Sequence, residues 1–209
     1  YTKKSKKKVV TSKITTTVQT TTTQQVSIAN ETAVSTTSSG TSVAQATAAA
    51  SSSQNQSKYE ANVASVAGKM DNRVIAAYQQ LGFKLVVDPS VNYSGYFDAR
   101  SRSITMKQID DSVYHELGHF LAFIAGNVDK TASFQSIFAA EKANVTAFNK
   151  AYVTQNASEY FAESVKDYIL NNASLKSTRP QTYAAVQNAL NQITDAQIAK
   201  IQKIYGAFW

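Results

Sequence analysis

Residues 112–125 constrain the fold more than any other part of the chain. They contain the only two histidines of the 209-residue sequence, His115 and His119, which lie four positions apart. Residues 112–114 carry no charge and residues 120–125 are apolar, so a helix at this place would be buried. Bare imidazoles in a buried helix are costly without a partner. The segment therefore predicts a central helix, covered by other elements, with both histidines on one face.

The composition changes abruptly at Lys58–Tyr59, where we place a domain boundary. Ser and Thr fill 25 of the first 57 positions, and no aromatic residue follows Tyr1 in this segment. Such a sequence buries too little apolar area to offset an ordering cost of ~1–2 kcal/mol per residue. We therefore expect residues 1–57 to be a disordered tether and residues 58–209 to form the folded domain.

The net charge of +7 is concentrated in the tether. Residues 1–57 hold six lysines and one acid, whereas residues 58–209 hold 15 basic and 13 acidic residues. No aromatic residues are interleaved with these lysines to stack on bases, so no nucleic acid partner is expected. Loose contact of the tether with an anionic cell surface is expected instead.

Two further functional classes are excluded by the sequence. The chain has no cysteine, which removes disulfides, thiolate metal sites and cysteine nucleophiles. Its apolar runs fall far short of the ~20 residues that a membrane-spanning helix needs, so no membrane span is expected.

Hydrophobic periodicity predicts an α+β domain, mostly helical, with a small sheet before the central helix. We expect a helix over residues 59–81, followed by short strands at 84–87, 95–97 and 103–106. Further helices are predicted at residues 133–153, 157–172, 179–191 and 194–206.

The sequence His115-Glu116-Leu117-Gly118-His119 has the spacing of a zinc site on a helix. Two imidazoles one turn apart can reach one cation, and Glu116 beside them can take a proton from a metal-bound water. A five-residue pattern also arises by chance, and histidines at this spacing are often surface neighbours. The buried character of the flanks favours the metal, and one Zn²⁺ ion is predicted.

A hydrolytic zinc site needs a third protein ligand and one open position. A third histidine in the metzincin pattern is excluded, because Ala122 and Ala125 replace the required glycine and histidine. The ligand must then be a carboxylate on another element. Spacing alone does not choose between Glu159 and Glu163. The available carboxylates are Glu141, Glu159, Glu163 and Asp167.

The combination of His115-Glu-Leu-Gly-His119 with Glu159-Tyr-Phe-Ala-Glu163 resembles the catalytic domain of the anthrax lethal factor family. That family includes small secreted Pro-Pro endopeptidases of Gram-positive bacteria. The resemblance covers residues 59–209 and implies a zincin-like metallopeptidase domain. It also implies that Glu159 is the third zinc ligand and that Glu163 orients a ligand histidine.

The resemblance also implies a catalytic role for Tyr152, since the family carries a tyrosine seven positions before the ligand glutamate. A phenol at this place can stabilise the oxyanion of a tetrahedral intermediate. The competing interpretation is an ordinary half-buried tyrosine, one of 11 in the chain.

We therefore predict a secreted or cell-surface zinc endopeptidase, monomeric, that hydrolyses extended protein segments with a water activated by Glu116. Proline-rich segments are one substrate class that the resemblance implies. Strand 95–97 could offer its edge to such a segment. Nearby aromatic residues either contact substrate or belong to the core: Tyr93, Tyr96 and Phe97.

Two alternative functions compete with this prediction. One is a toxin-like protease that acts on host proteins. The other is a surface-tethered binding module that holds zinc without activity. The presence of Glu116 argues against the second, because a purely structural site needs no base beside its ligands.

Overall fold

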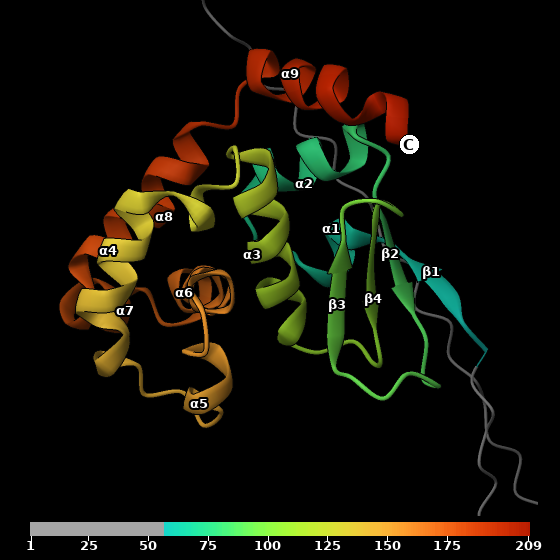
Figure 1. Ribbon diagram of the computed structural model, residues 1–209. Helices are drawn as coiled ribbons and strands as arrows, with labels where there is room; N and C mark the ends of the chain where they lie inside the picture. Colours follow the sequence, from blue (N-terminus) through green and yellow to red (C-terminus); the bar gives the residue numbers. More distant parts are fainter. Residues whose placement is uncertain (1–56) are drawn as a thin grey trace, which may run out of the picture. The chain divides into compact units, whose positions relative to one another are not determined.

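The computed structural model describes residues 57–209, so the predicted tether lies outside the described residues except for Ser57. Within this range a small sheet comes first and helices follow (Figure 1). The strands are β1 (Tyr59–Ala61), β2 (Lys84–Val87), β3 (Gly95–Asp98) and β4 (Ser103–Met106). The helices are α1 (Val63–Val66), α2 (Asn72–Gln80), α3 (Ser112–Ile124), α4 (Ala132–Glu141), α5 (Lys150–Val153), α6 (Ala157–Leu170), α7 (Asn172–Thr178), α8 (Pro180–Asn191) and α9 (Asp195–Tyr205). Single 3-10 turns are η1 (Val128–Lys130), η2 (Lys142–Asn144) and η3 (Gly206–Phe208).

The four strands form one sheet in the order β1-β2-β4-β3. The central pair, β2 and β4, is parallel, and the outer pairs are antiparallel. Side chains alternate along each strand, so those of one face are buried: Leu85, Val87, Ile104 and Met106. The order leaves β3 at one edge, with one side of its backbone free of a neighbouring strand in the described sheet.

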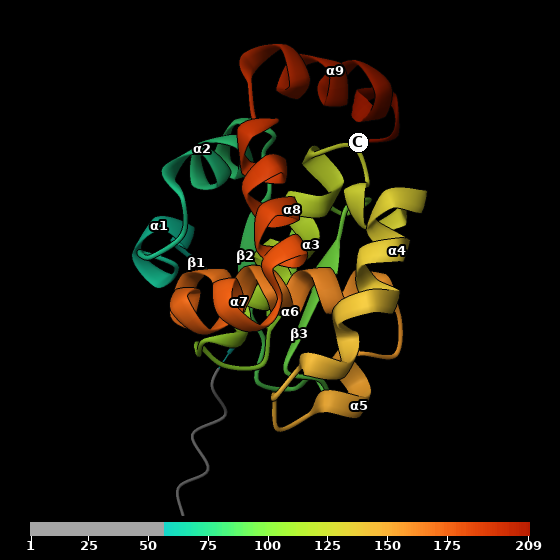
Figure 2. The ribbon, with the colours of Figure 1, turned by 90° about the vertical axis from the view of Figure 1, so that its left-hand side faces the viewer.

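Helix α3 lies between the sheet and the later helices (Figure 1). All of its residues are buried except Ser112 and His119. Figure 2 shows α4, α6, α7 and α8 on the side of α3 away from the sheet. The α+β class, mostly helical with a small sheet before the central helix, is thereby confirmed.

Gly118 allows α3 and α6 to approach closely. A Cβ atom added to Gly118 would lie 2.7 Å from both the Cα and the carbonyl oxygen of Ala162. Those are backbone atoms, which cannot rotate away, so only glycine fits at this crossing. The close approach brings the histidines of α3 within reach of side chains from α6.

The single helix predicted over residues 59–81 is wrong. Tyr59–Ala61 pairs with β2 instead, and two capped helices follow. The side chain of Asn62 accepts a hydrogen bond from the amide of Ser65, and that of Asp71 accepts one from the amide of Arg73. Each cap begins a new helix. The predicted apolar positions are nevertheless mostly buried: Val63, Ala67, Met70, Val74, Ile75 and Tyr78.

The continuous helix predicted over residues 133–153 is also wrong, because the chain leaves helical geometry between η2 and α5. Glu141 ends α4 with its carboxylate turned to the start of α8, where it accepts hydrogen bonds from the amides of Gln181 and Thr182. The break lets the chain fold back, so that α5 lies beside α6. Tyr152 therefore lies on a separate short helix, α5.

Helix α7 lies between the helices predicted at residues 157–172 and 179–191, where the sequence predicts no helix. Side-chain bonds from Asn171 to Asp167 and from Asn172 to the carbonyl of Tyr168 end α6 before this helix begins. Among residues 57–209, no helix has both the length and the apolarity needed to cross a bilayer.

Candidate metal centre

Helix α3 presents His115 and His119 on the face that meets α6. Their ring centroids lie 5.0 Å apart, as expected for side chains one helical turn from each other. His115 is buried and His119 is partly open to solvent. His115 is therefore shielded from solvent, and His119 borders a cleft.

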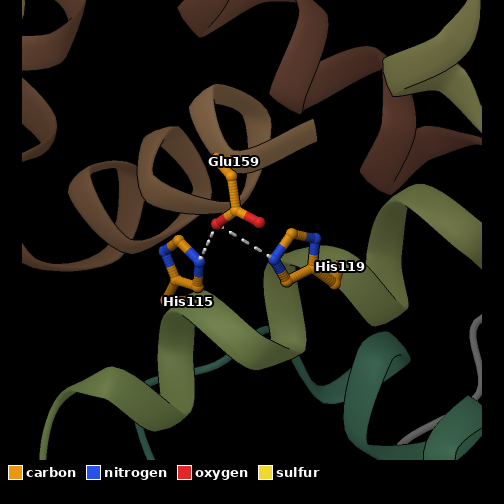
Figure 3. Close-up of side chains that lie close together, drawn as sticks. All are labelled: His115, His119 and Glu159. Carbon is orange, nitrogen blue, oxygen red and sulfur yellow. Dashed lines mark hydrogen bonds and ion pairs between the residues drawn. The ribbon is translucent and has the colours of Figure 1, made fainter. Parts of the chain in front are cut away.

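Helix α6 brings Glu159 to the same place. The side chain of Asn156 accepts a hydrogen bond from the amide of Glu159 at 2.9 Å, which caps the helix and fixes its first turn. The Glu159 carboxylate then points between the two imidazoles (Figure 3). One oxygen, Oε2, lies 3.1 Å from Nε2 of His115 and 3.6 Å from Nε2 of His119.

This arrangement fits the coordination shell of a metal ion. The three ligand atoms all lie within 4.8 Å of one another. Zinc bonds of ~2.0–2.2 Å at a tetrahedral centre place two ligand atoms about 3.4 Å apart, between the two measured separations. Two imidazole nitrogens and a carboxylate oxygen are also a donor set that zinc accepts. The residues could therefore hold a single divalent ion with little movement.

Glu163 fixes the orientation of His115. Its Oε2 atom lies 2.9 Å from Nδ1 of His115 in the buried contact between α3 and α6. Burial raises the pKa of the Glu163 carboxyl, but the hydrogen bond with His115 and the nearby Lys166 outweigh burial and lower it. An ionised Glu163 accepts a hydrogen bond from the Nδ1–H group of His115, so Nε2 is the atom of His115 that can bind a metal.

The electrostatics of the cluster are those of a cation site. Burial by itself would lower the pKa of His115, yet the hydrogen bonds to Glu159 and Glu163 raise it to about 9. Burial by itself would raise the pKa of Glu159, yet its contacts with the two histidines hold it well below the usual range. The carboxylates thus stabilise a positive charge between them, carried here by a proton on His115.

Glu116 lies where α3 meets β3, with its carboxylate against Gly95. It is buried, and burial raises the pKa of its carboxyl despite the opposing effect of His115 and His119. Glu116 shares the wall of one small pocket with His119 and Glu159. A carboxylate with a raised pKa beside a metal-bound water is suited to accept a proton and return it.

Tyr152 reaches the site from α5. Its ring centroid lies 6.4 Å from that of His115, and the side chain lines the same pocket as Glu116 and Glu159. Burial and the negative charge of Glu159 raise the pKa of Tyr152 to about 12, so its hydroxyl remains protonated at neutral pH. The residue is half exposed and can donate a hydrogen bond into the cleft.

A groove runs along the edge of β3 past this cluster. Three hollows of about 540, 180 and 270 Å³ follow one another: the first two share wall residues of β3, α3 and α5, and the last two share Phe97 and His119. Tyr93 and Tyr96 line the groove and are exposed, with ring centroids 5.9 Å apart. Phe97 packs on Phe83 and Phe120 in the core and also lines two of these hollows. Tyr93 and Tyr96 are therefore exposed in the groove, whereas Phe97 belongs partly to the core.

Of the four carboxylates considered from the sequence, the structure brings two to the histidines. Glu159 lies between both imidazoles, and Glu163 lies behind His115. Glu141 caps α8, and Asp167 pairs with Arg179. Neither of these two lies in the cluster.

Two features of the site have no signal in the sequence. Asp129 accepts a hydrogen bond from Ser158, which ties η1 to the first turn of α6 next to Glu159. Gly95 of β3 lies against Glu116. Both contacts join residues more than 20 positions apart, and no spacing rule points to them.

A comparison with known protein families finds a match to this part of the chain. Residues 98–189 match the family described as anthrax toxin lethal factor, N- and C-terminal domain. The match extends from the end of β3 into α8, so it includes α3, α5 and α6 with the whole cluster. Residues 98–189 thus match the lethal factor-like family, the family that the two motifs resemble.

One relative of this chain is the Pro-Pro endopeptidase of Clostridioides difficile (strain 630). It is 41% identical over 78 residues, which are 35% of this chain. The aligned part spans about a third of the relative's own length, 34%.

Proposed function

We propose that this domain is a zinc-dependent endopeptidase. The observation that carries the proposal is the convergence of His115, His119 and Glu159, with ligand atoms within 4.8 Å of one another. Glu116 lines the same groove beside them. A structural metal site has no need of a buried carboxylate at that place, whereas a hydrolytic site does.

His115, His119 and Glu159 would hold the ion, and Glu163 would keep His115 in the binding tautomer. When bound, zinc supplies Lewis-acid chemistry, polarising a peptide carbonyl and lowering the pKa of water to ~7. Glu116 accepts the proton of the attacking water and passes it to the leaving amine. Tyr152 donates a hydrogen bond to the oxyanion that develops on the peptide carbonyl.

The groove supports an extended peptide as substrate. Because β3 is an edge strand, a peptide can pair with its free side and pass the histidines along the groove. Tyr93 and Tyr96 offer exposed rings on which proline can pack. The endopeptidase from C. difficile is named for Pro-Pro bonds, and we propose proline-rich segments as the first substrates to test here. An extracellular address is part of the same proposal.

A library of quenched fluorescent peptides tests this function. The full chain, loaded with zinc, is incubated with peptides that contain Pro-Pro and with matched peptides in which alanine replaces each proline. We expect cleavage that stops on chelation and returns when zinc is added back. The cut sites then show whether proline is required.

The Glu116→Ala variant is the control for adventitious protease. It should retain zinc, because Glu116 is not a ligand, and lose ~10²–10⁴-fold in rate through loss of the base. Cleavage by this variant at the wild-type rate would rule out the proposed mechanism. Stoichiometric zinc without cleavage of any peptide would rule out the proposed activity for this substrate class.

A further inference from the structure

Gly95, at the start of β3, lies unusually close to the carboxylate of Glu116. A Cβ atom added to Gly95 would lie 2.6 Å from Oε1, 2.7 Å from Cγ and 2.9 Å from Cδ of Glu116. Real Cβ atoms essentially never come within 3.0 Å of a heavy atom outside their own and the two adjoining residues. Three atoms of one side chain thus occupy the space that any other residue at position 95 would need.

The backbone does not explain the glycine. The positive φ angles among the described glycines belong to Gly82 and Gly126, so Gly95 has a conformation that other residues adopt freely. Glycine in a strand is otherwise unfavourable, since it loses more conformational entropy on folding than alanine does. The remaining reason for glycine is the space that it leaves, as is common where another group approaches a strand closely.

Glu116 has little freedom to move away from a larger residue. It is 6% exposed and lies between α3 and the sheet. Its Cγ atom is only two bonds from the helix backbone, so relief of a clash at Cγ requires rotation about χ1. Helical residues have few χ1 rotamers to choose from. A methyl group at position 95 would therefore turn the carboxylate out of its present position.

We propose that Gly95 is a positioning residue for Glu116: the absence of a side chain at 95 lets the carboxylate lie under the edge strand and face the groove. Gly95 and Glu116 line the same two hollows of that groove. The catalytic part of this inference rests on the proposed peptidase function. The packing part, a direct steric coupling between residues 95 and 116, does not.

A double-mutant cycle in the full chain separates the two parts. The proteins are wild type, Gly95→Ala, Glu116→Ala and the double variant, each measured by urea unfolding after chelation. We expect Gly95→Ala to lower the unfolding midpoint of the wild type. In the Glu116→Ala background the added methyl has room, so the same substitution should leave the midpoint unchanged or raise it. An equal loss of midpoint in both backgrounds would overturn the proposal.

The kinetic arm uses zinc-loaded protein and the peptides cut by the wild type. Gly95→Ala should lower kcat by ~10–100-fold, with KM and zinc content little changed, because the base is misplaced while ligands and substrate contacts remain. Gly68→Ala is the matched control. A Cβ at Gly68 would meet only the carbonyl oxygen of Ala64, at an ordinary 3.7 Å.

An unchanged kcat in Gly95→Ala would overturn the positioning role. A wild type that cuts no peptide contradicts the peptidase function instead, and the unfolding cycle still decides the steric coupling. A fall in zinc content that parallels the fall in kcat would assign Gly95 to the integrity of the metal centre and would also contradict the proposal.

Discussion

Oε2 of Glu163 lies 2.9 Å from Nδ1 of His115, and both side chains are buried between α3 and α6. The contact directs the other imidazole nitrogen of His115 toward Glu159 and His119. Glu163 touches no atom that would bind the ion. Its expected effect on metal binding is therefore transmitted through His115 alone.

Replacing Glu163 by glutamine should weaken zinc binding by ~10–100-fold, the usual effect of removing a carboxylate that orients a ligand histidine. The amide can still accept one hydrogen bond, but it lacks the negative charge. Competition with a chromophoric chelator measures the affinity. Lys166→Met is the control, since it removes the 3.5 Å contact and the charge beside the other oxygen of Glu163 but keeps the contact of Glu163 with His115. Equal affinities for Glu163→Gln and wild type would show that the contact does not support the metal.

Replacing Tyr152 by phenylalanine should lower kcat by ~10²–10³-fold, the effect of removing one oxyanion donor, and leave zinc content unchanged. The matched control is Tyr96→Phe, which removes an exposed hydroxyl from the same groove. Steady-state kinetics on one cleaved peptide compare the two variants. If Tyr152→Phe loses no more activity than Tyr96→Phe, Tyr152 has no role as an oxyanion donor.

The raised pKa of His115 predicts a pH dependence for the metal-free protein. Burial opposes the rise, but Glu159 and Glu163 bring the pKa to about 9, against about 6.5 for an unperturbed histidine. Protonated His115 thus contributes stability that is fully present below about pH 6.5 and is lost as pH rises through about 9. Unfolding midpoints of chelator-treated protein between pH 6 and 10 should fall over that window. A constant midpoint would contradict the assigned charge state.

Metal binding should have the opposite pH dependence, because the ion must displace the proton from His115. The apparent zinc affinity should rise about tenfold per pH unit up to about pH 9 while one proton is released. Titration calorimetry in buffers of different ionisation enthalpy counts the released protons. Binding without proton release would mean that His115 is already neutral in the metal-free site.

Replacing Gly118 by alanine should destabilise the domain by ~1–3 kcal/mol, the usual cost of forcing extra volume into a packed core. The methyl would meet the backbone of Ala162 at 2.7 Å and push α6 away from α3. Zinc affinity should fall in parallel, because Glu159 moves with α6. Gly206→Ala, whose Cβ would meet only a glutamine side chain at 4.0 Å, is the control for urea unfolding. Unaltered stability of Gly118→Ala would show that the helices can separate without cost.

The sequence predicted the central features of the domain because they follow from local rules. His115 and His119 share a helix face through the helical repeat, and the short strands before α3 follow from alternation and turns. The choice of Glu159 over Glu163 did not follow from spacing, since both lie on the same face of α6. That choice rested on the resemblance, and the structure places Glu159 between the imidazoles.

The failures came where long-range contacts override local preference. Tyr59–Ala61 continues an apolar helical pattern, yet it pairs with β2. Residues 142–149 contain neither proline nor glycine, yet Glu141 turns to cap α8 and the chain breaks there. The contact of Gly95 with Glu116 joins a strand to a helix 21 positions later. None of these partners is visible in the local sequence.

The most direct test of the central claim is a crystal structure of the zinc-loaded chain with anomalous data collected on both sides of the zinc absorption edge. The account predicts one anomalous peak per chain, at bonding distances of ~2.0–2.2 Å from Nε2 of His115, Nε2 of His119 and a carboxylate oxygen of Glu159. Glu116 should lie near the peak without bonding to it. A peak bound elsewhere, or no peak between α3 and α6 at saturating zinc, would contradict the account.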